Sequence, residues 1–402
     1  MNKIAILENR ILEYAWGSRS YISSLTGKKT PSAKPQAEMW MGAHRKAPSI
    51  VNTENKKIPL DELIREHPVE ILNRSAADKF SKELPFLFKV LAASKPLSIQ
   101  AHPDKKQAAE GFNREEINKI PVDAPERNYR DKNHKPELIC AISNMWLLKG
   151  FRHPSQIIEF FSPFEKILNK PGNDFIKKLA ASGNLKDFFK DLLYVDERTK
   201  NRLLDEMLNI SEKLINSDPA YKWVDRLGQE YPNDTGVLSP LFLNLINLKP
   251  GEALYLPARE LHSYLDGAGL EIMANSDNVL RGGLTKKHVD KAELIKVLDF
   301  TPAEVKKIKP RKLNPFEYVY DSQAEEFMLS VIELTDTGSI YKSSESRSVE
   351  IILCINGHAE ISAAPDNRLT LNKGMCALIP ASAGTYTING KSTLYKAAVP
   401  EL

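Results

Sequence analysis

One short pattern occurs twice in this chain and limits the folds open to it. Residues 248–258 read LKPGEALYLPA, and residues 371–381 read LNKGMCALIPA. In both copies a glycine precedes a short apolar run that ends in Pro-Ala, with equal spacing from glycine to proline. Such internal similarity is typical of a duplicated supersecondary unit. Because many other short apolar runs are separated by Gly and Pro, we predict two antiparallel β-sandwiches or jelly rolls.

The spacing of apolar residues changes between about residues 154 and 232. Leu185, Phe188 and Leu192 fall at helical spacing, and Lys, Asp and Glu fill the opposite faces. At 402 residues the chain is long enough for two or three domains. We therefore predict a mainly β protein with a helical insertion. The expected division is a first barrel begun in 1–152, a helical domain in 153–235, the rest of the first barrel and a connection in 236–318, and a second barrel in 319–402.

Composition excludes several classes of protein. The formal net charge is only +4, and basic residues form no stripe with interleaved aromatics, so we expect no nucleic-acid partner. The first residues lack the apolar run of a secretory signal, and no stretch is apolar and long enough to span a bilayer, so we expect no membrane partner. Cys140, Cys354 and Cys376 are far apart and lack Cys-x-x-Cys spacing. We interpret them as reduced structural thiols of a cytoplasmic protein.

The stretch 84–105 combines a buried strand with a row of polar side chains. Its first part, LPFLFKVL, is almost continuously apolar and predicts a strand buried on both faces. After a break at residues 94–96 it continues as LSIQAH. Alternate side chains of a strand share a face, so Ser98, Gln100 and His102 are expected to point to one side. The residues between them are expected to face a core: Leu97, Ile99 and Ala101.

Four residues form a candidate metal site. Gln100 and His102 end that strand, Glu137 begins the apolar run 138–142, and His262 follows the first copy of the repeat. Two imidazoles, a carboxylate and an amide oxygen suit Zn²⁺ best, with Mn²⁺, Co²⁺ or Fe²⁺ as alternatives. Each histidine alone is better explained as an ordinary hydrogen-bonded residue. The combination favours a metal, because every member lies beside a predicted strand of the same half.

A cationic turn follows the last of these residues. Arg281 is followed by two glycines, and Lys286 and Lys287 come soon after. Glycines permit a close backbone approach, and the cations suit a phosphate or an anionic intermediate. Taken alone, the turn is better explained as a solvated charged loop.

Five longer stretches contain these residues and are unusually specific. They are YAWGS (14–18), AEMWMGAH (37–44), PLSIQAHPDK (96–105), YRDKNHKPE (129–137) and HSYLDGAGLEIMANSDNVLRGGLTKK (262–287). Together they resemble the motifs of the type I mannose-6-phosphate isomerases. The chain differs from the family at Lys286, where a proline is usual, so which of the two lysines faces a phosphate stays open.

The resemblance implies a fold and an activity. It implies two cupin-like jelly-roll barrels with a helical insertion, the second barrel lacking the metal site. We expect a monomer that acts on a small-molecule sugar phosphate. The resemblance also implies a zinc-dependent interconversion of mannose 6-phosphate and fructose 6-phosphate through a cis-enediol(ate). Carried over by position, the zinc ligands are Gln100, His102, Glu137 and His262. The catalytic candidates are Arg281, Lys135, His134 and Asp277, and the substrate-binding candidates are Ser98, Lys287 and Lys286.

Two other functions compete with the isomerase. One is a metal-holding cupin that binds a sugar phosphate as a sensor without turnover, and Arg281 and Lys135 argue against it because a sensor does not need groups that handle charge and protons. The other is a cupin dioxygenase or a different metal-dependent sugar isomerase. No redox signature in the sequence favours a dioxygenase.

Overall fold

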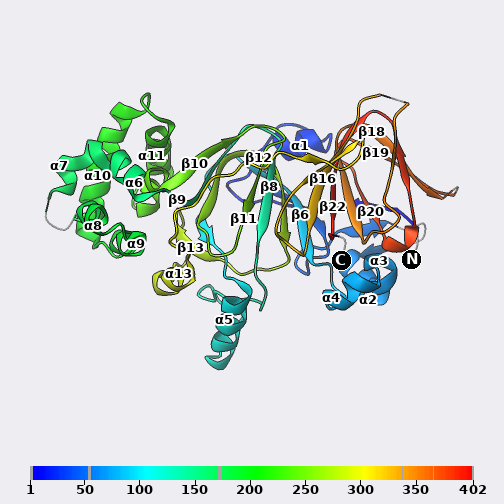
Figure 1. Cartoon of the computed structure of the whole chain (residues 1–402), viewed down its shortest axis with the longest axis horizontal. Coiled ribbons are helices and arrows are strands. Elements are labelled where there is room, and N and C mark those ends of the chain that lie inside the picture. Colours follow the sequence, from blue (N-terminus) through cyan, green and yellow to red (C-terminus); the bar gives the residue numbers. More distant parts are fainter. Residues whose placement is uncertain (1–2, 53–55, 171–173, 337, 365, 401–402) are drawn as a thin grey trace.

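The computed structural model describes residues 3–52, 56–170, 174–336, 338–364 and 366–400, and the chain forms three parts in a row (Figure 1). A helical part lies at one end, a first barrel lies in the middle, and a second barrel lies at the other end. The predicted mainly β fold with a helical insertion is therefore confirmed.

The first barrel is built from one sheet of ten described strands. Its long central strand pairs with four neighbours, so it ties both halves of the barrel together. The strands are β2 (Arg10–Leu12), β3 (Glu38–Gly42), β6 (Phe86–Ala93), β7 (Ile99–Ala101), β8 (Glu137–Ala141), β9 (Met145–Phe151), β10 (Leu243–Leu248), β11 (Ala253–Leu256), the central β12 (His262–Ala274) and β13 (Leu280–Gly283).

The second barrel contains a sheet of twelve described strands, three of which come from the first sixty residues. They are β1 (Ala5–Glu8), β4 (Ile50–Asn52), β5 (Lys57–Pro59), β14 (Arg311–Lys312), β15 (Glu317–Tyr320), β16 (Met328–Leu334), β17 (Ile340–Lys342), β18 (Glu350–Ala364), β19 (Asn367–Asn372), β20 (Cys376–Ile379), β21 (Thr387–Asn389) and β22 (Ser392–Ala398). Strand β1 pairs with β20, with Ala5 opposite Leu378. The expected boundaries stay a prediction, and β1, β4 and β5 cross the one drawn between 1–152 and 319–402.

The repeated sequence pattern corresponds to a repeated structure. Gly251 and Gly374 both have left-handed backbones, with φ of 84° and 83°. Each is followed two residues later by a four-residue buried strand, β11 in one barrel and β20 in the other. Glycine adopts this conformation without strain, which explains its place at both turns.

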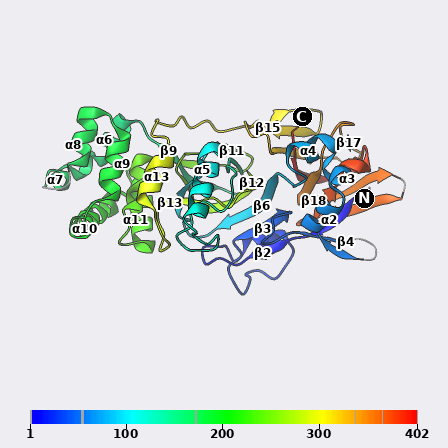
Figure 2. The same cartoon turned by 90° about the horizontal axis from the view of Figure 1, so that it is seen from below.

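The insertion is helical, as the sequence predicts. The insertion contains α6 (Pro154–Phe161), α7 (Glu165–Leu168), α8 (Phe175–Ser182), α9 (Leu185–Leu193), α10 (Glu197–Leu214) and α11 (Pro219–Glu230), followed by α12 (Ser239–Phe242). Elsewhere lie α1 (Tyr21–Leu25), α2 (Leu60–Glu66), α3 (Pro68–Leu72), α4 (Arg74–Lys79), α5 (Lys105–Ile117) and α13 (Lys291–Val297). Figure 2 shows α2, α3 and α4 against the second barrel. Among the helices of the described ranges, none is long and apolar enough to cross a membrane.

Helix α5 interrupts the strands of the first barrel. Residues 105–117 form about three turns of helix between β7 and β8. Asp104 caps this helix: its carboxylate accepts the Gln107 backbone N–H, and the Gln107 side chain accepts the Asp104 backbone N–H. This reciprocal capping box is a local signal for a helix start, and it lies directly after the predicted metal-site strand.

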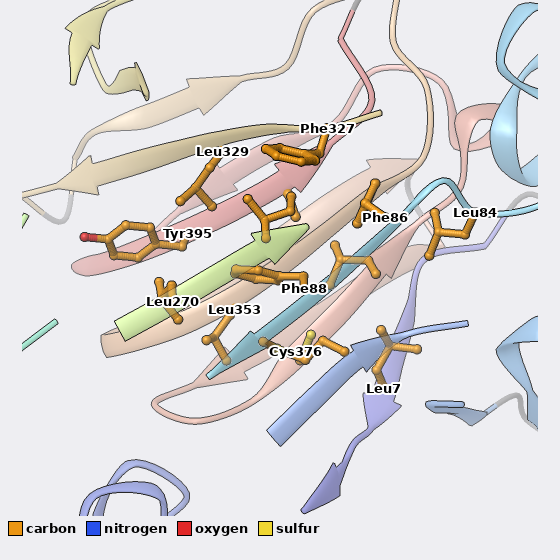
Figure 3. Close-up of a cluster of buried hydrophobic side chains, with 14 of the residues drawn as sticks. Leu7, Leu84, Phe86, Phe88, Leu270, Phe327, Leu329, Leu353, Cys376 and Tyr395 are labelled. Carbon is orange, nitrogen blue, oxygen red and sulfur yellow. The ribbon is translucent and has the colours of Figure 1, made fainter. Parts of the chain in front are cut away.

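The two barrels share one apolar core. Strand β6 is buried along its whole length, as predicted. Its even-numbered side chains, including Phe86 and Phe88, point out of the first barrel and pack against Leu329, Leu353 and Tyr395 of the second (Figure 3). Its odd-numbered side chains point into the first barrel, where Leu91 joins an interior cluster. One face of β6 therefore holds the barrels together while the other lines the interior.

Candidate functional site

Three ligand-type side chains meet inside the first barrel. His102 follows β7, Glu137 begins β8 and His262 begins β12, so three different strands position them. Their ligand atoms all lie within 4.8 Å of one another. The Nε2 atoms of His102 and His262 lie 3.3 and 3.4 Å from the two carboxylate oxygens of Glu137. The side chains are almost completely buried.

Hydrogen bonds orient both imidazoles for metal binding. Nδ1 of His102 lies 2.7 Å from the carbonyl oxygen of Asn278, and Nδ1 of His262 lies 3.0 Å from that of Glu260. A carbonyl only accepts, so each Nδ1 donates and each Nε2 keeps a free lone pair. Among the described residues, neither Nε2 atom has a hydrogen-bond partner. Because unsatisfied buried polar atoms are rare, their convergence fits a metal ion.

The protonation states also suit a metal. Burial, together with the nearby Lys135 ammonium, lowers the pKa of His102 to about 4. Burial alone would raise the pKa of Glu137, but Lys135 and His102 hold it well below its usual value. Lys135 Nζ lies 3.1 Å from Oε1 of Glu137. A neutral imidazole and an ionised carboxylate are the forms that bind metals.

Gln100 lies in register with this group. In the sheet it stands opposite His262 of β12 on one side and opposite Arg281 of β13 on the other. Residues directly opposite each other in an antiparallel pair share a face. The strand register therefore brings the fourth predicted ligand and the predicted arginine to the same side of the sheet.

A cavity of about 630 Å³ opens over these residues. Its lining includes most of the predicted site residues: Ser98, Gln100, Lys135, Glu137, Arg281, Lys286 and Lys287. Leu97 was expected to face a core but lines this cavity as well. Residues 94–98 precede β7 and are not part of a strand, so strict alternation does not apply to them.

One end of the cavity is cationic. Burial and the neighbouring Arg130 guanidinium lower the pKa of Arg281. Burial, then Arg281 and Arg130, likewise lower the pKa of Lys287. Cations whose pKa values are lowered by burial and by mutual repulsion are stabilised by a bound anion.

Four further buried polar residues line the cavity, and the sequence patterns assigned none of them a role: Glu38, Lys89, Tyr264 and Glu271. Lys89 Nζ lies 2.6 Å from Oε2 of Glu271 and 3.8 Å from Oε1 of Glu38, and the Tyr264 hydroxyl donates to Oε1 of Glu271 at 2.7 Å. Burial by itself would lower the pKa of Lys89. The carboxylates of Glu271 and Glu38 outweigh burial, so the pKa of Lys89 is raised above its usual value. A charged residue inside a buried apolar run, such as Lys89 in FLFKVLAA, was the signal available.

Two predicted catalytic residues do not line this cavity. His134 turns to the second barrel, where its Nε2 lies 2.7 Å from Oε1 of Glu326. Asp277 lines a neighbouring cavity of about 570 Å³ and contacts Lys46 at 2.8 Å and His44 at 3.5 Å. Both residues belong to loops next to β8 and β12, but their side chains lie outside the cavity that Lys135 and Arg281 line.

Two β-barrels of the cupin type, one with a buried His/Glu/His group and an open cavity, define the class of this protein. The family model "Phosphomannose isomerase type I, catalytic domain" matches residues 4–154. The family model "Mannose-6-phosphate isomerase, cupin domain" matches residues 319–399. The chain belongs to the type I mannose-6-phosphate isomerase family of enzymes.

Individual relatives agree over nearly the whole length. Mannose-6-phosphate isomerase of Escherichia coli (strain K12) is 36% identical over 393 residues, covering 96% of this chain and 97% of that protein. The Homo sapiens mannose-6-phosphate isomerase is 32% identical over 405 residues, covering 92% of each chain. A crystal structure of zinc-bound mannose 6-phosphate isomerase superposes with a TM-score of 0.90 at 34% identity and covers 99% of both chains.

Proposed function

We propose that this enzyme interconverts mannose 6-phosphate and fructose 6-phosphate. The observation that carries the proposal is a single cavity lined both by Gln100 and Glu137 of the metal-type group and by the cations Arg281 and Lys287. A sugar phosphate has the matching chemistry, with oxygens for a metal at its reacting carbons and a dianion at its far end. Family membership supports the same substrate pair.

We infer that Gln100, His102, Glu137 and His262 hold one Zn²⁺ ion. Free Nε2 lone pairs and a carboxylate fit zinc, and the related zinc-bound structure supports this choice. When bound, the ion polarises the substrate oxygens and makes the neighbouring carbon more acidic.

The reaction moves a proton between C2 and C1, and we propose a cis-enediol(ate) as the intermediate. Lys135 and Arg281 provide positive charge beside the reacting carbons, where water is scarce and electrostatic stabilisation is strong. The hydrogen-bonded chain of Lys89, Glu271 and Tyr264 lies along the same wall and offers groups that can hold a proton. His134 and Asp277 stay predicted proton-handling residues, acting from outside this lining.

We infer that Ser98, Lys286 and Lys287 bind the phosphate. The phosphate is remote from the reacting carbons, so its binding energy can orient them. Lys287 is favoured over Lys286 because burial and two guanidiniums already lower its pKa. The three cysteines of the chain are buried and unpaired, as expected for a cytoplasmic enzyme. That the enzyme acts as a monomer stays a prediction.

Incubation of the zinc-loaded protein with mannose 6-phosphate tests the proposal. We expect fructose 6-phosphate to accumulate until equilibrium and deuterium to enter the product in heavy water. Unphosphorylated mannose, the matched control, is expected to be a very poor substrate because it cannot use the cationic end. Binding of mannose 6-phosphate without product or exchange would identify a sensor instead.

A further inference from the structure

The chain leaves the helical insertion through residues 230–236, and this return segment borders the cationic end of the cavity. Asp234 lies at its centre. One carboxylate oxygen accepts the Gly236 backbone N–H at 2.7 Å, and the other accepts the Thr285 backbone N–H at 3.2 Å. Asp234 thus connects the insertion to the turn that carries Lys286 and Lys287.

That turn has an unusual backbone that its surroundings must maintain. Gly283 has a φ of 137°, and Leu284, which is not a glycine, has a φ of 54°. A left-handed backbone is unfavourable for a residue with a side chain, so other contacts have to hold Leu284 in it. The Leu284 side chain is buried in one cluster with Val237 and Leu241, which follow the same return segment.

The approach between the two segments is close. A Cβ atom added to Gly283 would lie 3.0 Å from Oδ1 of Asp234, and one added to Gly236 would lie 2.9 Å from the Leu284 nitrogen. Two glycines are therefore required for this carboxylate to reach the turn.

The same segment also contacts residues 95 and 96, which line the cavity. Glu230 forms an ion pair with Lys95 at 2.9 Å, and the Tyr231 hydroxyl donates to the carbonyl of Pro96 at 3.0 Å. Residues 95 and 96 lead into the stretch with Ser98. Both loops expected to contact the phosphate are thus attached to the end of the insertion.

We propose that Asp234 is a positioning residue for substrate phosphate: it fixes the turn 283–285 and thereby aims Lys287 into the cavity. The inference rests on the proposed function and deepens it, because it gives the helical insertion a part in substrate binding although the insertion contributes no reacting group. Losing the carboxylate frees the Thr285 N–H and lets Leu284 relax to an ordinary backbone, which moves Lys287.

The test compares Asp234→Ala and the isosteric Asp234→Asn with wild type. Each variant is expected to raise KM for mannose 6-phosphate about tenfold, the loss expected for one charge-assisted hydrogen bond, with a smaller change in kcat. The inhibition constant of inorganic phosphate should rise in parallel, and zinc content should stay at the wild-type level.

Asp218→Ala is the matched control. Asp218 also accepts the backbone N–H two residues ahead at 2.7 Å, in the same insertion, at the start of α11. It therefore shares the capping contact of Asp234 but does not reach the turn, and KM should be unchanged. If Asp234 served only as a structural cap, Asp234→Ala and Asp218→Ala would have the same KM.

A double variant separates positioning from general damage. If Asp234 acts through Lys287, then Asp234→Ala adds little to the KM of Lys287→Ala, whereas independent effects would multiply. An unchanged KM and phosphate inhibition in both Asp234 variants, or full multiplication in the double variant, would overturn the inference. Failure of the wild type to isomerise mannose 6-phosphate would instead overturn the proposed function.

Discussion

Two buried imidazoles share the carboxylate of Glu137, which lines the cavity, so activity should follow the metal. We expect a chelator to abolish turnover and Zn²⁺ to restore it, and occupancy to fall in acid because the ligands must be deprotonated. His102→Ala and His262→Ala should each lower the bound zinc sharply, as measured by elemental analysis. His358→Ala, an exposed change in the second barrel, should leave zinc and rate nearly unchanged. Full activity of metal-free protein would contradict the ligand assignment.

Arg281 stands opposite Gln100 in the sheet and is not itself a ligand-type residue. If it stabilises negative charge that develops during the reaction, its loss should fall on kcat more than on KM. We expect Arg281→Ala to keep its zinc and lose on the order of 100-fold in kcat, as for removal of one oxyanion donor. Arg281→Lys should restore only part, because an ammonium lacks the planar two-pronged contact. Normal turnover by Arg281→Ala would contradict this role.

At the scale of elements, Asp277 joins the loop after β12 to the loop after β3 through Lys46. Burial raises the pKa of Asp277, but contacts with His44 and Lys46 outweigh it and lower the pKa below its usual value. The resulting stability is present above the unfolded pKa of about 3.9 and is lost as the pH falls through the depressed folded value.

Asp277→Asn should therefore unfold more easily than wild type at neutral pH, by about 1 kcal/mol. The difference should shrink as the pH falls below about 4. Urea unfolding at several pH values measures it, and Asp266→Asn, at a half-exposed ion pair with Arg226, is the control. A difference that stays constant with pH would show that the charge of Asp277 is not involved.

At the scale of the whole molecule, the two barrels should unfold as one cooperative unit. They share the apolar core of Figure 3, and β1, near the start of the chain, pairs with β20 of the second barrel. All four tryptophans precede residue 224, so tryptophan fluorescence does not report on the second barrel directly.

Phe327→Ala tests this coupling, because Phe327 is a buried residue of the shared core that lies beyond every tryptophan. We expect a loss of about 3–5 kcal/mol, as for deletion of a buried aromatic ring. The fluorescence and circular dichroism transitions should shift together. A fluorescence transition that does not move would mean that the barrels unfold independently. Leu313→Ala, at a half-exposed position, should change stability by less than about 0.5 kcal/mol.

Features that depend on neighbours in sequence could be predicted from the sequence alone. The apolar run of β6, the helical spacing of the insertion and the repeated glycine turns are local patterns, because backbone geometry and side-chain period act over a few residues. His102, Glu137 and His262 could be singled out for the same reason, since each lies at the end of an apolar strand and offers a ligand atom.

Features that depend on pairing between distant segments were decided only by the tertiary structure. No sequence window relates Lys89 to Glu271, β1 to β20 or Asp234 to Thr285. Their partners are set by strand register and by how the barrels and the insertion pack, and these depend on the whole core. Side chains predicted from motif position alone, such as His134 and Asp277, therefore lie where that packing places them, because the direction of a loop side chain has no period in the sequence to predict it.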